Sequence, residues 1–176
     1  PFMECKHGIV SVNHDLNGGL KIKNVSIDFT GGKGYIEKDW GTSFPEAWLW
    51  IQCNNFKDHN TSFTFSIAKI PWRRKFFVGF IVFLYYNKKF FLFSTYNNST
   101  LTEMHHNGKS IGLTLKNHNF ILKVNTTINT FGELRAPSSG DMSRRIKESI
   151  DSDITLSLFD KNNNLIRNLA LTAHLD

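Results

Sequence analysis

The sequence predicts an all-β fold of antiparallel strands joined by tight turns. Strand-like runs recur through the 176 residues with turn signals between them, whereas helical periodicity is hard to find. An apolar fraction of 40% with 14% aromatic residues indicates a packed globular protein rather than a disordered chain. Consecutive hairpins favour a meander, which protects its edges by closing into a barrel or by packing as a sandwich.

Each expected strand is a run of apolar, aromatic and β-branched residues bounded by turn residues. In chain order, we expect strands over residues 9–13, 20–29, 34–39, 47–55, 61–70, 76–86, 89–95, 100–105, 110–116, 120–126, 154–159 and 165–173. The turns between them carry Asn and Gly, which tolerate the left-handed conformations that tight hairpins need. These signals are Asn17-Gly18-Gly19, Gly31-Gly32, Asn87-Lys88, Asn97-Asn98, Asn107-Gly108, Asn117-His118-Asn119 and residues 160–164.

The alternation of apolar and polar residues fades between Phe131 and Ser152. Here we expect a loop over residues 135–140 and a short helix over residues 142–150. Internal repeats, low-complexity tracts and linkers are not found in the sequence, so residues 1–176 are expected to form a single domain.

Residues 34–54 gather three of the four tryptophans and three carboxylates beside a turn. In an extended chain, Tyr35, Glu37 and Asp39 share one face and Trp40 takes the other. Residues 41–45 contain Gly41 and Pro45, which break the strand. If the strands on either side of this turn pair, the acids lie on the same face as the tryptophans that follow.

The second strand of this segment also alternates. Trp48, Trp50 and Gln52 fall on one face, and Leu49, Ile51 and Cys53 on the other. A carboxyl group packed against indole rings and away from water favours its neutral form, in which it can deliver a proton. The segment therefore predicts the wall of a ligand pocket with acid chemistry.

Two stretches carry a family resemblance: GYIEKDWGTSFPEAWLWIQCNNF at residues 34–56 and LRAP at residues 134–137. Both resemble elements of the tocopherol cyclase family, in which an EK(D/N)WG-x-x-FP core leads into a Trp-x-Trp-x-Gln-Cys strand. The GY-x-(D/E)-x-(D/N)-WG core is also similar to one in carotenoid hydratases, whose relatives carry paired lipocalin-like β-barrels. The resemblance implies an antiparallel lipocalin-like β-barrel around an apolar ligand, as one half of a larger two-barrel protein.

The resemblance further implies a reaction and the residues for it. A prenyl alkene on a quinol is protonated, and the phenol oxygen attacks the tertiary cation to close a chromanol ring, with no metal or other cofactor. Glu37 is the first candidate for the proton donor, and Asp39 its partner, because the family pattern accepts Asn there. The residues expected to bind the substrate are Tyr35, Trp40, Trp48, Trp50, Gln52 and His14.

Other interpretations of these residues stay open. Glu37 and Asp39 can pair with Lys38, Arg73 or a backbone amide and simply stabilise the turn. The domain is then a non-catalytic module that binds a hydrophobic ligand, or a structural support for a site elsewhere. His7 and His14 are candidates for a base that takes the phenol proton, although a solvated or core histidine is the commoner role.

Charge and cysteine content bound the possible partners. The net charge of +6 is scattered among Asn-rich turns rather than gathered in a run, which favours a solvated surface over nucleic-acid binding. Two cysteines are too few for a disulfide scaffold. His105 and His106 are adjacent on a strand, so their side chains point to opposite faces. At most Glu103 and His105 share a face, which is too few ligands to predict a metal site.

The segment from Pro71 to Phe80 combines basic and aromatic residues. It suits a peripheral contact with an anionic membrane, or burial against another part of the protein. Pro1 is not an initiator methionine, so we expect this chain to be a C-terminal portion of a longer protein, in contact with its N-terminal half. We expect a cytoplasmic location, with membrane association through this segment.

Overall fold

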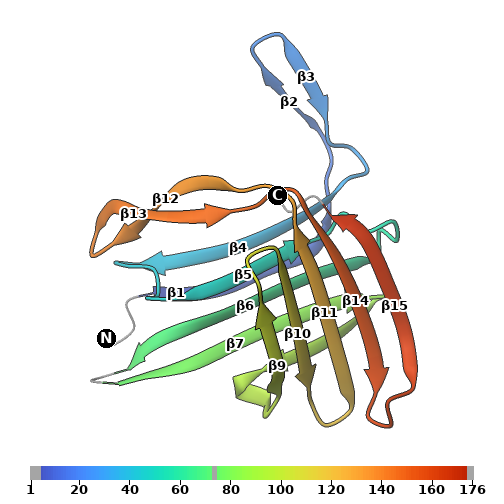
Figure 1. Cartoon of the computed structure of the whole chain (residues 1–176). Helices are drawn as coiled ribbons and strands as arrows, with labels where there is room; N and C mark the ends of the chain where they lie inside the picture. The colour runs from blue at the N-terminus through green and yellow to red at the C-terminus, as the bar shows by residue number, and fades with distance from the viewer. Residues whose placement is uncertain (1–4, 73–74, 174–176) are drawn as a thin grey trace.

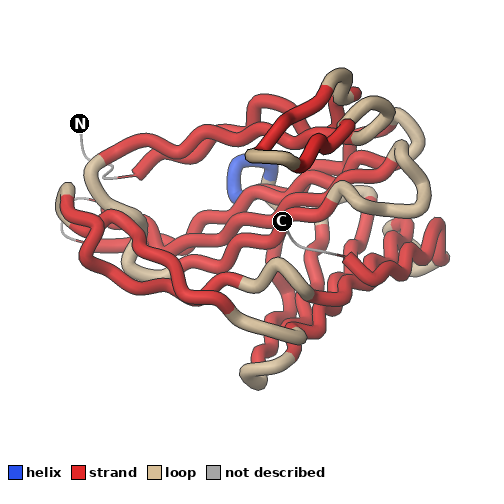
Figure 2. The backbone as a smooth tube through the Cα atoms, turned by 90° about the horizontal axis from the view of Figure 1, so that it is seen from above, coloured by secondary structure: helices blue, strands red, loops and turns tan. Residues whose placement is uncertain are grey.

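A computed structural model describes residues 5–72 and 75–173, and strands dominate them (Figures 1 and 2). The all-β prediction is confirmed. Within the described residues, the single helix is the one-turn η1, Thr95–Asn97, so none is long and apolar enough to cross a membrane. The strands are β1 Cys5–Asp15, β2 Gly19–Ile22, β3 Val25–Asp28, β4 Lys33–Gly41, β5 Trp48–Cys53, β6 Thr61–Trp72, β7 Lys75–Tyr86, β8 Lys89–Ser94, β9 Thr100–His106, β10 Ser110–Lys116, β11 Phe120–Ile128, β12 Gly132–Ser138, β13 Asp141–Glu148, β14 Ser152–Asp160 and β15 Leu165–Ala173.

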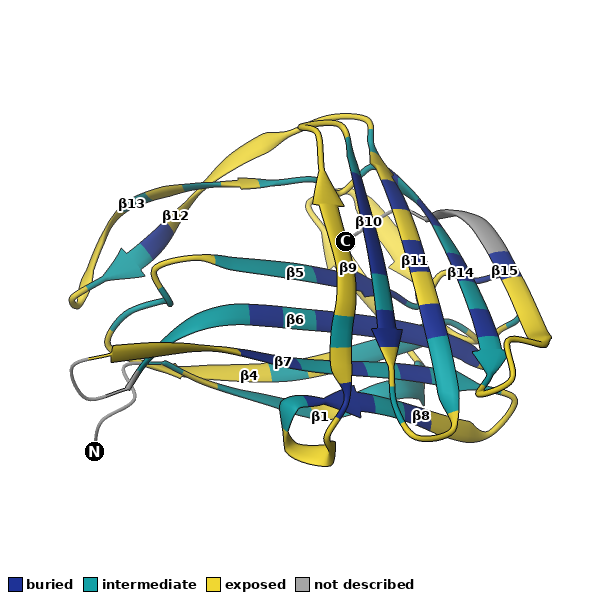
Figure 3. Cartoon of the chain, turned by 60° about the horizontal axis from the view of Figure 1, so that its bottom comes forward, coloured by how far each residue is buried: buried dark blue, intermediate teal, exposed yellow. Residues whose placement is uncertain are grey.

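The core lies between two antiparallel sheets. One has the order β5-β6-β7-β8 and the other β15-β14-β11-β10-β9, and their strands cross at a steep angle in Figure 1. Side chains at every second position face inward, as in the buried pair Phe63 and Phe65 of β6 opposite Leu156 and Leu158 of β14. Figure 3 shows buried positions alternating with exposed ones along β11 of the five-stranded sheet.

A third layer covers the outer face of the four-stranded sheet. Strands β1 and β4 form a separate antiparallel ribbon, with His7 opposite Asp39 and Ile9 opposite Glu37. Residues 9–13 of β1 line a small cavity together with Phe83, Tyr85 and Phe90 of the β7–β8 hairpin. The ribbon therefore lies along one side of the four-stranded sheet, and the five-stranded sheet lies along the other, so the four-stranded sheet is the middle sheet of the three layers.

The strands do not close into a barrel. In residues 5–72 and 75–173, the hydrogen-bonded strands form five separate sheets, so the expected lipocalin-like barrel is not confirmed. The turn at residues 41–45 does not make a hairpin either, because β4 pairs with β1 while β5 pairs with β6. Strand β5 is thus left as an edge of the middle sheet.

Three predicted elements, in two regions of the chain, were wrong. The single strand expected at residues 20–29 is a projecting hairpin, β2–β3, whose turn contains Lys23 at a φ of 55° (Figure 1). The loop and helix expected over residues 135–150 form the hairpin β12–β13 instead. Along β13 the half-buried positions alternate with exposed ones, but they include the charged residues Arg144 and Glu148. The strand therefore has no matching alternation of hydrophobic and polar residues in its sequence.

We expect Leu122→Ala to lower the free energy of unfolding by about 2 to 5 kcal/mol. Leu122 has no exposed surface and lies between Leu115 of β10 and Leu158 of β14 in one row across the five-stranded sheet. Urea denaturation followed by fluorescence measures the change. The control Met104→Ala removes an exposed side chain of β9 and is expected to change stability by less than about 0.5 kcal/mol; equal losses would contradict this placement of the core.

Candidate ligand cavity and acid site

A cavity of about 810 Å³ runs past the edge strand β5. Its lining includes Trp50 and Gln52, which face the β1–β4 ribbon, and Leu49 and Ile51, which face the five-stranded sheet. The cavity therefore extends along both faces of β5. Its volume lies within the range of roughly 300 to 1,000 Å³ that is usual for small-molecule sites.

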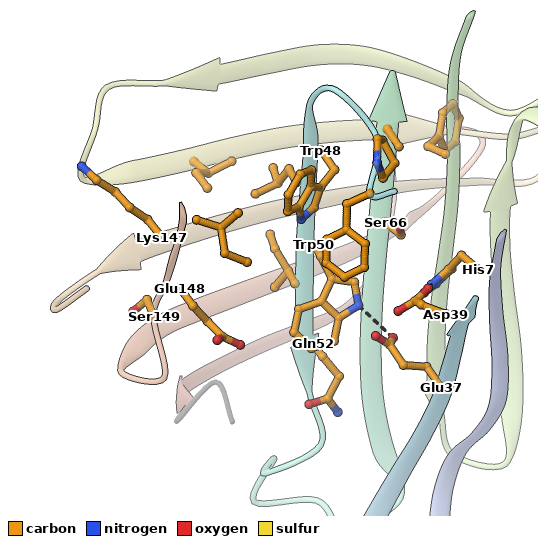
Figure 4. Close-up of a pocket in the computed structure, with 18 of the residues that line it drawn as sticks. His7, Glu37, Asp39, Trp48, Trp50, Gln52, Ser66, Lys147, Glu148 and Ser149 are labelled. Atoms are coloured by element: carbon orange, nitrogen blue, oxygen red, sulfur yellow. Dashed lines mark hydrogen bonds and ion pairs between the residues drawn. The ribbon is translucent and has the colours of Figure 1, made fainter. Parts of the chain in front are cut away.

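Glu37 lies in the wall of this cavity and is held by two hydrogen bonds to one oxygen. The indole Nε1–H of Trp50 donates to Oε2 at 2.9 Å (Figure 4). The hydroxyl of Tyr35 donates to the same oxygen at 2.5 Å. The two bonds orient the carboxyl group, one from Tyr35 on the same strand and one from Trp50 on β5. Among the residues that the structure describes, no hydrogen bond reaches the second oxygen, Oε1.

Tyr35 supports Glu37 from behind. Its hydroxyl also lies 3.2 Å from Oγ1 of Thr64 on β6. Burial, followed by the hydrogen bond to Glu37, raises the pKa of Tyr35 above its ordinary range. Because the hydroxyl of Tyr35 donates its hydrogen bond to Glu37, the hydroxyl of Thr64 is the donor in the second bond, and a chain of hydrogen bonds from Thr64 through Tyr35 ends at Oε2.

His7 and Asp39 form a second polar pair beside Glu37. They are cross-strand neighbours on the ribbon, and Nδ1 of His7 lies 2.7 Å from Oδ1 of Asp39. Both residues line the cavity (Figure 4). Among the described residues, Nε2 of His7 is buried with no hydrogen-bond partner.

The cavity holds other buried polar groups that the described part of the protein leaves unpartnered. Gln52 is 5% exposed, and its Nε2 has no acceptor there. Thr126 is 3% exposed on the other side of β5, and its Oγ1 is likewise unpaired. An unpaired buried polar group is costly unless a ligand or water meets it.

The hairpin β12–β13 is held against the turn of residues 42–46. Arg144 donates from Nη1 to the carbonyl of Pro45 at 2.7 Å and from Nη2 to that of Glu46 at 2.6 Å. Its guanidinium also lies 4.6 Å from the centre of the Trp48 ring. The amide of Phe44 donates to the carbonyl of Pro137, so the two stretches that carried the family resemblance contact each other.

The predicted binding residues divide into three groups. Trp48, Trp50 and Gln52 line the cavity. Tyr35 lies behind Glu37 rather than in the lining. Trp40 lies outside it, 45% exposed beneath Lys38, and His14 lies elsewhere on β1, with Nδ1 3.0 Å from Oγ of Ser11.

The ion pairs considered for the acids are largely replaced by other contacts. Lys38 lies over Trp40, and Arg73 falls outside the described residues. The third acid of the segment, Glu46, pairs with Lys69 at 2.6 Å on the surface. Glu37 is therefore bound by neutral donors inside the molecule, which differs from a surface ion pair that stabilises a turn.

Sequence reasoning missed Arg144 and the pairing of His7 with Asp39. Arg144 fell in the expected helix, where its side chain had no defined direction. His7 precedes the strand expected at residues 9–13, and β1 begins earlier, at Cys5. Period-two parity extended upstream from Ile9 would have placed His7 and Ile9 on one face.

Three side chains of the site have the composition of a metal site. His7, Glu37 and Asp39 each offer one ligand atom, and these atoms lie within 4.8 Å of one another. Glu37 and Asp39 also accept hydrogen bonds from protein groups. Both cysteines are free, and burial raises the pKa of the Cys53 thiol to about 11, which makes it a poor metal ligand near neutral pH.

The comparisons with known proteins agree with the resemblance. The profile of the tocopherol cyclase-like family matches residues 4–175. The chain is 24% identical over 169 residues to a protein of Oryza sativa subsp. japonica named probable tocopherol cyclase, chloroplastic. It is 36% identical over 56 residues to the chloroplastic tocopherol cyclase of Zea mays.

The matched regions differ in extent. The rice match covers 93% of this chain and 36% of the relative, and the maize match covers 32% of this chain and 12% of the relative. The chain thus spans about a third of the length of the rice protein. No solved structure matches the chain.

We expect Arg144→Met to loosen the β12–β13 hairpin over the cavity. The substitution removes two hydrogen bonds from a charged donor and lowers the free energy of unfolding by about 1 to 3 kcal/mol. Hydrogen exchange across residues 132–148 is expected to rise at the same time. The neighbouring control Arg145→Met breaks an exposed pair with Glu133 and costs less than about 1 kcal/mol. Equal effects of the two variants would contradict the role of Arg144 in holding the β12–β13 hairpin against residues 42–46.

Proposed function

Since the chain belongs to the tocopherol cyclase-like family, we propose that it binds a prenylated quinol and cyclises it to a chromanol. The observation that carries this proposal is the position of Glu37. Its carboxyl group lies in the wall of a cavity, beside the indole of Trp50, with one oxygen held by two donors and the other without a hydrogen bond from any residue in the described ranges. Such a group is oriented toward a ligand before the ligand arrives.

The reaction needs one proton donor and one nucleophile. Oε1 of Glu37 gives its proton to the alkene of the prenyl chain, and a tertiary carbocation forms. The phenol oxygen then attacks this carbon, the new C–O bond closes the ring, and the phenol proton leaves to a base. The face of Trp50, whose N–H edge donates to Glu37, stabilises the cation through the quadrupole of the ring, and neither an oxidant nor a reductant is consumed.

The two sides of the cavity suit the two parts of such a ligand. Polar groups gather on the ribbon side, at His7, Glu37 and Gln52. Past β5, the lining includes Ile111, Ile128, Leu134 and Ile146, which suit a prenyl chain. We propose a lipocalin-like way of holding the ligand, with the remainder of the longer protein completing the enclosure.

A non-catalytic, lipid-binding module is the alternative function. It is favoured by the same hydrogen bonds, because a carboxylate that accepts from Trp50 and Tyr35 is also a stable structural group. In that case the cavity binds an apolar ligand, and Glu37 serves to join β4 to β5. Turnover of a defined substrate distinguishes the two.

We also propose a peripheral contact with a membrane through the β6–β7 hairpin. Phe76, Phe77 and Val78 are exposed, and the positive charge of Lys75 lies beside them. An exposed apolar group flanked by basic residues is suited to an anionic lipid surface, from which a prenylated substrate can be drawn. The cytoplasmic location expected from the sequence stays a proposal beside this one.

Glu37→Gln in the full-length protein is expected to lower kcat for a synthetic prenylated hydroquinone by about 10² to 10⁴-fold. Gln keeps the size of the side chain and still accepts from Trp50, but it has no acidic proton to deliver. Formation of the chromanol is measured by liquid chromatography and mass spectrometry, and binding by tryptophan fluorescence. Binding is expected to persist.

Glu46→Gln is the matched control, because Glu46 lies in the same segment but pairs with Lys69 outside the cavity. It is expected to leave kcat unchanged. Turnover of Glu37→Gln at the wild-type rate would show that the proton comes from another group. A wild-type protein that binds the hydroquinone without converting it would favour the lipid-binding alternative.

For the membrane contact, we expect the wild-type protein to float with vesicles that contain anionic phospholipid. The double variant Phe76→Ser/Phe77→Ser is expected to weaken partitioning roughly tenfold or more, since burial of one Phe side chain contributes about 1.5 to 3 kcal/mol. The control Leu165→Ser/Ile166→Ser removes another adjacent exposed apolar pair, on β15. Equal flotation of both double variants would exclude the β6–β7 hairpin as the contact.

A further inference from the structure

We propose that His7, positioned by Asp39, is the base that takes the phenol proton when the ring closes. This inference rests on the proposed cyclisation and assigns its second half. The proposed acid and base would then be neighbours on the β1–β4 ribbon, with Glu37 acting on the alkene and His7 on the phenol. Asp39 is a positioning residue, because it acts through His7.

The hydrogen bond between His7 and Asp39 selects the tautomer of the imidazole. Nδ1 lies 2.7 Å from Oδ1 of Asp39. A carboxylate can only accept, so Nδ1 carries the proton and donates it, and the lone pair of the neutral ring is on Nε2. The carboxylate also stabilises the imidazolium that forms when Nε2 takes up a proton.

The surroundings of Nε2 match this role. The atom is buried and has no hydrogen-bond partner among the described residues, although His7 lines the cavity. A buried acceptor without a partner costs free energy in the empty protein. A phenol hydroxyl donating to Nε2 removes that cost, so the substrate itself completes the hydrogen bonding of the site.

The distance between acid and base fits the reaction. Ile9 is opposite Glu37 and His7 is opposite Asp39, so His7 and Glu37 are diagonal neighbours on one face of the ribbon. One ring nitrogen of His7 and one carboxylate oxygen of Glu37 lie within 4.8 Å of each other, so the two side chains are close enough to meet one small ring. Ring closure protonates one carbon and deprotonates one oxygen of the same small ring, and therefore needs its acid and its base close together.

The two groups also return the site to its starting state. The proton of Glu37 becomes a C–H bond, the π electrons of the alkene form that bond, and the phenol oxygen donates a lone pair to the cation. The phenol O–H breaks and its proton moves to Nε2 of His7. Transfer of that proton from His7 to Glu37 restores both groups, so an isomerisation proceeds with no net uptake or release of protons.

Three other groups in or next to the lining, Tyr35, Cys5 and Gln52, are less suited to this step. The hydroxyl of Tyr35 is committed to Glu37, and burial raises the pKa of the Cys5 thiol. Gln52 has no basic atom near neutral pH. Its unpaired Nε2–H is a donor, which suits the second oxygen of the quinol and helps to direct the first toward His7.

The test is chemical rescue in the full-length protein. His7→Ala is expected to lower kcat for the synthetic prenylated hydroquinone by about 10² to 10⁴-fold, with little change in KM. Added imidazole is expected to restore turnover in a saturable way, because it occupies the space left by the side chain. Rescue is expected to be weaker in His7→Ala/Asp39→Asn, where the carboxylate that orients the ring is absent.

Several controls separate this inference from the proposed function. His118→Ala, at an exposed turn between β10 and β11, is expected to behave as wild type. Where the Ala variant does not fold, His7→Gln replaces it, and loss of kcat with retained binding is the supporting result. If Glu37→Gln is inactive while His7→Ala turns over normally, the base assignment is wrong and the cyclisation stands.

Two further outcomes would overturn the assignment. Loss of turnover in a folded His7→Ala protein that imidazole does not rescue would make His7 a structural residue. Loss of wild-type turnover on chelation, restored by Zn²⁺, would mean that His7, Glu37 and Asp39 hold a metal ion. If the wild-type protein does not convert the hydroquinone at all, the proposed function fails and the base assignment fails with it.

Discussion

The hydrogen bond from Trp50 to Glu37 joins two layers that share no backbone pairing. Strand β4 pairs with β1 and strand β5 pairs with β6, so the ribbon and the middle sheet meet there through side chains. Tyr35 and Thr64 make a second connection beside it. These side-chain contacts set the distance between the ribbon and β5 on the polar side of the cavity. If β4 were hydrogen-bonded to β5 directly, no space would remain between the two strands.

Strand parity was the part of the site that could be predicted from sequence. It placed Tyr35, Glu37 and Asp39 on one face, Trp40 on the other, and Trp48, Trp50 and Gln52 together, since alternation depends only on the local backbone. Which strand pairs with which depends on distant residues, and so β1 as the partner of β4 was missed. The expectation that the acids meet the tryptophans held for a different reason: the two strands face each other instead of pairing.

Residues 131–152 show where hydrophobic patterning fails. The strand β13 turns Arg144, Ile146 and Glu148 inward, and two of these three are charged. Arg144 is accommodated because carbonyl oxygens and an indole ring receive its guanidinium. A strand stabilised by polar contacts of this kind resembles a loop or an exposed helix in sequence, and its nature becomes visible only when its partners at residues 44–48 are in place.

The residues that line the cavity extend along the chain from Cys5 to Ser152. Its walls are therefore joined by contacts of long sequence separation, for which the entropy of loop closure must be overcome before any contact is gained. The binding site is expected to be among the last parts of the domain to form during folding. A ligand that requires all of these walls binds only the nearly complete native state, and so each increment of its affinity stabilises the whole domain rather than one hairpin.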